Sequence, residues 1–340
     1  METNRRLEKK LSELMPLNHF LATGFSRNSL FLLIKAYGWG KGDEMIVPAF
    51  TCPVIPKTIE LSGMVPVPVD SEADGLNIDS DQFVSSITEN TRAVYVVHTY
   101  GTPANIDRIV AVARGKGLIV IEDLAHALFS SYNGKQLGTF GDFAILSFTK
   151  KIINFEGGAI GTDNTYIYRK MSALAEKYNA PAKVSQADLV DKYVRSLGAW
   201  WESTFSLPAL LLMKFNDFLN ELIYKGEYGI RVDDSKFISD PLSSKITLSQ
   251  LDMMKAGKKT ANFSRYKEKF KNYLVIIDVD GEGDNTLPDY YTGIPLKKRG
   301  FFKLLSFRTW HNINPIGKYP RADYLYANYR IFTKIIMWFK

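Results

Sequence analysis

The feature that most constrains the fold is a regular alternation of short apolar runs and helical repeats between residues 24 and 162. Two runs, Val94–Val97 and Leu118–Ile121, are continuously apolar, as strands are in a parallel sheet that helices cover on both faces. Between such runs, apolar residues recur at helical spacing, as in Asn105–Ala113. This repeated strand–helix–strand pattern predicts an α/β fold with a mostly parallel sheet flanked by helices.

The pattern also sets the expected order of elements. We predict strands at Met45–Phe50, Val65–Val69, Ala93–His98, Leu118–Glu122, Phe143–Phe148 and Ala159–Thr162. We predict helices in the first sixteen residues and at Pro53–Leu61, Ser80–Ile87 and Asn105–Ala113. Beyond about residue 165 helical patterns replace the alternation. We therefore assign residues 20–235 to a large α/β domain, and residues 1–19 with 236–340 to a smaller α+β domain.

Composition and charge narrow the classes of protein. The chain has 340 residues, which leaves room for two domains. Cys52 is the only cysteine, so an intrachain disulfide is excluded, and the N-terminus lacks the apolar core of a signal peptide. We therefore expect a cytoplasmic protein. Its net charge of +7 is uneven, because residues 1–150 carry −2 and residues 151–340 carry +9.

Reactive side chains follow the predicted strands, where ligands bind in α/β sheets. Asp123 follows one strand and Lys150 another, and residues Gly24–Leu30 open the first central helix. A carboxylate and a lysine at one sheet edge meet the needs of pyridoxal phosphate (PLP), whose pyridine nitrogen pairs with an acid while an amine forms the Schiff base. Backbone N–H groups, hydroxyls and Arg27 at the helix start would suit its phosphate.

Six short motifs occur in a fixed order in this part of the chain. They are Gly42–Pro48, Phe50–Cys52, Gly63–Asp70, His98–Gly101, Ile121–Ala127, and Ser147-Phe148 followed by Lys150 and Glu156-Gly157-Gly158. In this set and order the chain resembles the DegT/DnrJ/StrS-type sugar aminotransferases, which are PLP enzymes of fold type I. The resemblance runs from about Gly24 to Thr162 and implies that fold, with a large PLP-binding domain and a smaller C-terminal one.

The resemblance also implies site residues. The lysine six positions before the acid of the acid-Gly-Gly turn is Lys150 and not Lys151, so Lys150 would form the Schiff base. Asp123 would pair with the pyridine nitrogen, and His126 would lie at the ring and its phenolic oxygen. The remaining cofactor-binding residues implied are Ser26, Arg27 and Ser147 at the phosphate, and Cys52 where many members carry a stacking aromatic ring. We predict no metal site.

The function implied by the resemblance is amino transfer. We expect a PLP-dependent enzyme that moves an amino group from an amino acid, glutamate in this family, to the keto group of a nucleotide-linked sugar. The pathway class would be cell-surface glycan or secondary-metabolite sugar biosynthesis, and the enzyme a homodimer. Because dehydratase relatives replace the lysine, retention of Lys150 argues against a 3-dehydratase.

Two alternatives come from other classes. In the family that the chain resembles, a neighbouring subunit often reaches the phosphate through an Asn-x-Arg stretch, which has no clear counterpart upstream of Gln250. A noncatalytic or membrane-associated relative, acting as a partner in a glycan assembly complex, would explain this departure and the one at Cys52. The hypothesis of nucleic-acid binding has less support, because the basic cluster Lys297–Arg299 lies in no nucleic-acid motif. We therefore predict no nucleic-acid partner. The +9 half would attract an anionic sugar nucleotide, while contact with an acidic membrane surface stays open.

Overall fold

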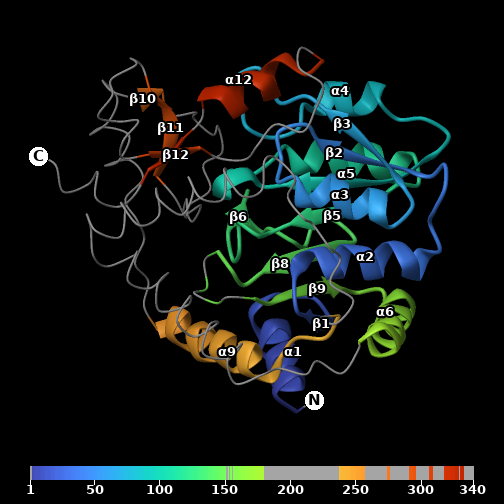
Figure 1. Ribbon diagram of the computed structural model, residues 1–340, viewed down its shortest axis with the longest axis vertical. Coiled ribbons are helices and arrows are strands. Elements are labelled where there is room, and N and C mark those ends of the chain that lie inside the picture. Colours follow the sequence, from blue (N-terminus) through green and yellow to red (C-terminus); the bar gives the residue numbers. More distant parts are fainter. Residues whose placement is uncertain are drawn as a thin grey trace, which may run out of the picture.

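The computed structural model describes most of the first half of the chain and part of the second. The described residues are 2–150, 152, 154, 156–179 and 237–256, with short segments at 274–275, 291–295, 306–308, 318–328 and 330–332. Predictions that concern Lys151 and Lys297–Arg299 lie outside these residues. Figure 1 shows a central sheet between helices, with α1 and α9 side by side next to β1.

The central sheet has seven strands in the order β1-β9-β8-β5-β4-β2-β3. Strands β3, β2, β4, β5 and β8 are parallel, whereas β9 runs antiparallel to both β8 and β1. The strands are β1 (His19–Thr23), β2 (Glu44–Pro48), β3 (Val65–Val69), β4 (Thr91–Val97), β5 (Ile119–Asp123), β8 (Phe143–Ser147) and β9 (Gly158–Thr162). The predicted α/β class with a mostly parallel sheet is confirmed.

Helices cover both faces of this sheet. One face packs against α2 (Ser26–Tyr37), α3 (Val54–Leu61) and α6 (Thr165–Tyr178). The other packs against α1 (Glu2–Leu14), α4 (Ser80–Ser85), α5 (Ile106–Gly115) and α9 (Pro241–Ala256). Side chains alternate between the two cores, as in β4, where Val94 and Val96 face α5 while Tyr95 and Val97 face α2.

The structure adds elements that the sequence pattern did not predict. Strand β1 pairs with β9 at the sheet edge, and a small hairpin joins β6 (Ser131–Tyr132) to β7 (Lys135–Gln136) through Asn133-Gly134, both with positive φ. In α1, Leu7 and Leu11 pack in the same core as Leu251 of α9. The division into a large and a small domain stays a prediction.

The C-terminal part contains a second sheet and a helix. Its four antiparallel strands, in the order β10-β11-β13-β12, are Leu274–Val275, Tyr291–Pro295, Arg330–Phe332 and Ser306–Arg308. Helix α12 (Pro320–Asn328) begins against β3, because the backbone N–H groups of Arg321 and Ala322 donate to the Asp70 carboxylate at 3.0 and 2.8 Å. Among the described helices, none is long and apolar enough to cross a bilayer.

Candidate active site

The carboxyl ends of the parallel strands bring the predicted site residues to one edge of the sheet. Asp123 is the last residue of β5 and Ser147 the last of β8. The charges of Arg27, Asp123 and Lys150 all act on the Cys52 thiol, whose pKa is raised chiefly by burial. The structure therefore gathers an acid, an amine, a guanidinium and the thiol, as the strand-end argument predicted.

Asp123 is buried and held in one orientation. The Tyr95 hydroxyl donates to Oδ2 and the Ala125 N–H donates to Oδ1, each at 2.8 Å. Burial raises the pKa of Asp123, while these two hydrogen bonds and the positive charge of Lys150 act in the opposite direction. A cationic N–H group placed beside a carboxyl group with a raised pKa lowers that pKa and favours the ionised carboxylate. A protonated pyridine nitrogen is such a group.

His126 lies against Tyr100. The Tyr100 N–H donates to His126 Nδ1 at 3.3 Å, and the two rings stack at 4.8 Å with an interplanar angle of 15°. Tyr100 belongs to the short 3₁₀ turn η1 (Thr99–Gly101) after β4, where its φ is 53°. Because Nδ1 accepts a hydrogen bond, the ring hydrogen lies on Nε2. That nitrogen can therefore donate to an anionic oxygen.

The predicted phosphate loop packs tightly on β9. A Cβ atom on Gly158 would lie 2.5 Å from the Ser26 nitrogen, so only glycine allows the start of α2 to approach this closely. Gly158 pairs with Thr23 on one side and Ser147 on the other, which brings Ser147 next to Gly158. The Ser147 hydroxyl lies 3.1 Å from that of Thr149, and the Arg27 guanidinium lies 3.9 Å from the Phe25 ring centroid.

This region has the donors that a phosphate monoester requires. The N-cap of α2 is Phe25, whose side chain makes no capping hydrogen bond, and the first amides of a helix attract anions. Hydroxyls of Ser26 and Ser147 and the guanidinium of Arg27 add side-chain donors. The donor set and the glycine-lined approach thus fit the phosphate of PLP, as Asp123 fits its ring nitrogen.

Lys150 is exposed and follows β8 by three residues. The chain after it is tied to α9, because the Asn154 amide donates to the Ser243 carbonyl, the Ser243 hydroxyl and the Thr247 hydroxyl at 2.9, 3.1 and 3.0 Å. Ser243 Oγ in turn donates to the Glu156 carbonyl at 3.0 Å. Helix α9 therefore holds Asn154 and Glu156, which lie four and six residues after the predicted catalytic lysine.

Sequence reasoning missed three of these supporting residues: Tyr95, Asn154 and Ser243. Tyr95 could have been found from strand parity, because it lies on the same face of β4 as Val97, the register partner of Asp123. No local sequence pattern indicates the contact between Asn154 and Ser243, because the two residues are distant in sequence. A cavity of about 580 Å³ at the opposite edge, lined by Trp39, Lys116 and others, contains none of the predicted site residues.

Comparison with known families finds a match over more than half of the chain. Residues 2–187 match the model of the DegT/DnrJ/EryC1/StrS aminotransferase family. The chain belongs to this family. A solved structure of a DegT/DnrJ/EryC1/StrS aminotransferase from Brucella abortus superimposes with a TM-score of 0.72 over 97% of this chain and 84% of that one, at 18% identity. That likeness shows the shared fold.

Two curated proteins match about half of this chain. The spore coat polysaccharide biosynthesis protein SpsC of Bacillus subtilis is 35% identical over 173 residues, which are 50% of this chain and 44% of SpsC. GDP-perosamine synthase of Caulobacter vibrioides is 37% identical over 169 residues, which are 49% of this chain and 46% of that enzyme. The matched region thus spans less than half the length of these curated relatives.

Proposed function

We propose that this chain is a PLP-dependent aminotransferase that transfers an amino group from an amino acid to the keto group of a nucleotide-linked sugar. The observation that carries the proposal is the grouping of Asp123, Lys150 and Arg27 around Cys52 at the carboxyl edge of the sheet. Membership of an aminotransferase family supports the reaction class. The names of the two relatives, a GDP-perosamine synthase and a spore coat polysaccharide protein, support the sugar.

Each predicted residue has a distinct task toward the cofactor. Asp123 would accept the N–H of the pyridine ring, and the Nε2 hydrogen of His126 would point to its phenolic oxygen. Ser26, Arg27 and Ser147 would hold the phosphate, and Lys150 Nζ would form the covalent bond. When bound, PLP supplies an electron-accepting ring that carries the amino group between the two half-reactions.

The protein's own groups would then control protons. Lys150 Nζ, once neutral, takes the proton from the reacting carbon and returns it, which is general acid–base catalysis. The Asp123 carboxylate keeps the opposite end of the site protonated, because a buried negative charge favours the cationic form of a neighbouring base. Tyr95 and Ala125 hold that carboxylate in the required orientation.

The substrate class and the donor rest on weaker support. The excess of positive charge lies in residues 151–340, and a positive field would attract a nucleotide diphosphate sugar. Glutamate as donor and a homodimeric state are carried over from the family resemblance, and the cytoplasmic location is likewise a prediction. We propose all of them as parts of the same function.

The decisive experiment locates the lysine that binds the cofactor. The purified chain is incubated with PLP, its visible absorbance is recorded, and borohydride reduction followed by peptide mapping identifies the labelled residue. We expect the label on Lys150, loss of label in Lys150→Arg, and retention in the matched control Lys151→Arg. A label on another lysine, or none at all, would contradict the assignment and favour a noncatalytic relative.

A second measurement tests the reaction. Glutamate added to the PLP-loaded chain should remove the visible absorbance and release an equivalent amount of 2-oxoglutarate. A nucleotide-linked keto sugar should then restore it. Absorbance that no amino acid changes would contradict amino transfer even if PLP binds.

A further inference from the structure

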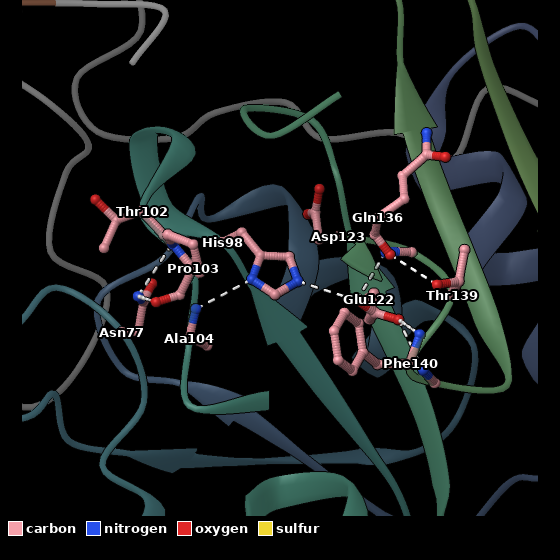
Figure 2. Close-up of polar contacts among 12 residues, drawn as sticks. Asn77, His98, Thr102, Pro103, Ala104, Glu122, Asp123, Gln136, Thr139 and Phe140 are labelled. Carbon is pink, nitrogen blue, oxygen red and sulfur yellow. Dashed lines mark hydrogen bonds and ion pairs between the residues drawn. The ribbon is translucent and has the colours of Figure 1, made fainter. Parts of the chain in front are cut away.

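Glu122 is buried on the face of β5 opposite to Asp123 and accepts four hydrogen bonds. Its Oε1 accepts from the backbone N–H groups of Phe140 and Gly141 at 2.8 and 2.7 Å, and its Oε2 accepts from Gly138 at 2.8 Å. The fourth donor is His98 Nε2 at 3.2 Å. Figure 2 shows this carboxylate between the His98 ring and the turn before β8. Four N–H donors therefore surround this one buried carboxyl group.

The hydrogen on His98 can be assigned from its two partners. His98 Nδ1 accepts the Ala104 N–H at 3.1 Å, so the hydrogen of the neutral ring lies on Nε2 and points to Glu122. Both side chains are fully buried. The pair therefore links β5 to the chain segment that follows β4, with one defined tautomer.

That segment contains the turn η1, which is held from both sides. On one side His98 accepts from Ala104. On the other, Asn77 Oδ1 accepts the Thr99 N–H at 3.0 Å, and its amide donates to the carbonyls of Thr102 and Pro103 at 3.1 and 3.0 Å. Tyr100 within this turn has a φ of 53°, a conformation that costs energy in a residue other than glycine and persists only where its surroundings impose it.

The constrained turn places Tyr100 on His126. The Tyr100 N–H reaches His126 Nδ1 and its ring covers one face of the imidazole. A histidine in solution can carry its hydrogen on either nitrogen. The Tyr100 N–H admits only the form with the hydrogen on Nε2.

We propose that Glu122 and His98 are positioning residues that, through the turn η1 and Tyr100, hold His126 in the Nε2–H tautomer. The part that concerns the cofactor rests on the proposed function, because there His126 donates to the phenolic oxygen. The tautomer itself does not depend on that function. Glu122 and His98 touch neither substrate nor cofactor and act through His126.

The test uses nitrogen-15 NMR of the histidine rings in the 340-residue chain without cofactor. The chain has four histidines, and single substitutions assign each ring. We expect both His98 and His126 to show the hydrogen on Nε2 in the unsubstituted protein. A hydrogen on Nδ1 of either ring would overturn the proposal without the need for a variant.

The variant Glu122→Gln tests the coupling. Its amide oxygen can face Phe140 and Gly141, but its NH₂ group then faces His98 Nε2, which must become an acceptor. We expect the His98 hydrogen to move to Nδ1, the Ala104 bond to break, and His126 to populate both tautomers. The matched control is Thr139→Val, which removes the 2.7 Å bond from Thr139 Oγ1 to Gln136 O in the same turn and should leave both rings unchanged.

The outcomes separate this proposal from the proposed function. If His126 keeps a single tautomer in Glu122→Gln, or changes equally in Thr139→Val, the coupling is wrong, whatever the chain catalyses. If the histidines behave as expected but borohydride labels no lysine, the coupling of Glu122 and His98 to His126 is confirmed and the proposed function is wrong. Should Glu122→Gln not fold, the spectrum of the unsubstituted protein still tests the tautomers of His98 and His126, and a hydrogen on Nδ1 of either ring overturns the proposal.

Discussion

The Tyr95 hydroxyl lies 2.8 Å from Asp123 Oδ2, and the two residues come from neighbouring parallel strands. Both side chains are buried, and each changes the pKa of the other. Asp123 helps to raise the pKa of Tyr95 well above its usual value, and the hydrogen bond from Tyr95 lowers the pKa of Asp123. This pair holds the Asp123 carboxyl group inside the protein, at the end of a strand, in one orientation.

Removing the Tyr95 hydroxyl should shift the pH dependence of cofactor binding. In Tyr95→Phe, Asp123 loses a donor that lowers its pKa, so the acid is protonated at higher pH than in the unsubstituted protein. We expect PLP affinity to fall by about tenfold, the equivalent of about 1.4 kcal/mol, and the loss of binding in acid to begin at higher pH. Absorbance titrations from pH 5 to 8 measure both. Tyr166→Phe, at an exposed position, is the control, and an unchanged pH profile in Tyr95→Phe would contradict the assignment.

Glu72 should make the free energy of unfolding depend on pH near neutrality. Burial, followed by the charge of Asp79, raises the pKa of Glu72 to about 7. Since the folded state then binds the proton more tightly than the unfolded one, the free energy of unfolding should fall as pH rises through this window. In Glu72→Gln, we expect the free energy of unfolding to fall by about 1 kcal/mol less between pH 5 and 8 than in the unsubstituted protein, a figure that allows for solvent screening of this partly exposed group. Urea titrations at each pH measure the difference. The exposed Glu89→Gln is the control, and equal slopes in both variants would count against this role.

Gly158 should not tolerate a side chain. The Cβ of Gly158→Ala would lie 2.5 Å from Ser26 N and 2.9 Å from Leu146 O, and backbone atoms must move to relieve this. We expect a loss of about 1–3 kcal/mol of stability together with weaker binding of the PLP phosphate. Gly115→Ala is the matched control, because no atom lies within 4 Å of its added methyl group. Melting temperatures that agree between the two variants would show that the close approach is absent in solution.

The tie between the lysine segment and α9 should affect both stability and labelling. Asn154→Ala removes the three donations to Ser243 and Thr247, and leaves buried acceptors with fewer partners. We expect the free energy of unfolding to fall by about 1–3 kcal/mol. We also expect the cofactor bond at Lys150 to form more slowly, as measured by the rise in visible absorbance. Ser249→Ala, which removes one exposed bond on α9, is the control. A normal rate in Asn154→Ala would mean that α9 does not position this lysine.

Local sequence patterns predicted the central strands and helices well. Strand β3 is found at the predicted Val65–Val69, and β4 and β5 are shifted by at most two residues at either end. Such elements are predictable because a doubly covered parallel strand must be apolar throughout, and its helix must present one apolar face. Strand β1 was missed because a short edge strand gains its hydrogen bonds from a distant partner, β9.

What the sequence determined by itself is the α/β class, the family and the residues at the strand ends, since motif order and strand boundaries are local properties. Tertiary structure decided how those residues are held. Tyr95 beside Asp123, Glu122 beneath His98, and Asn154 on α9 are contacts between segments 24 to 93 residues apart. Hydrogen bonds at such separations depend on strand order and helix packing, which no local pattern in the chain contains.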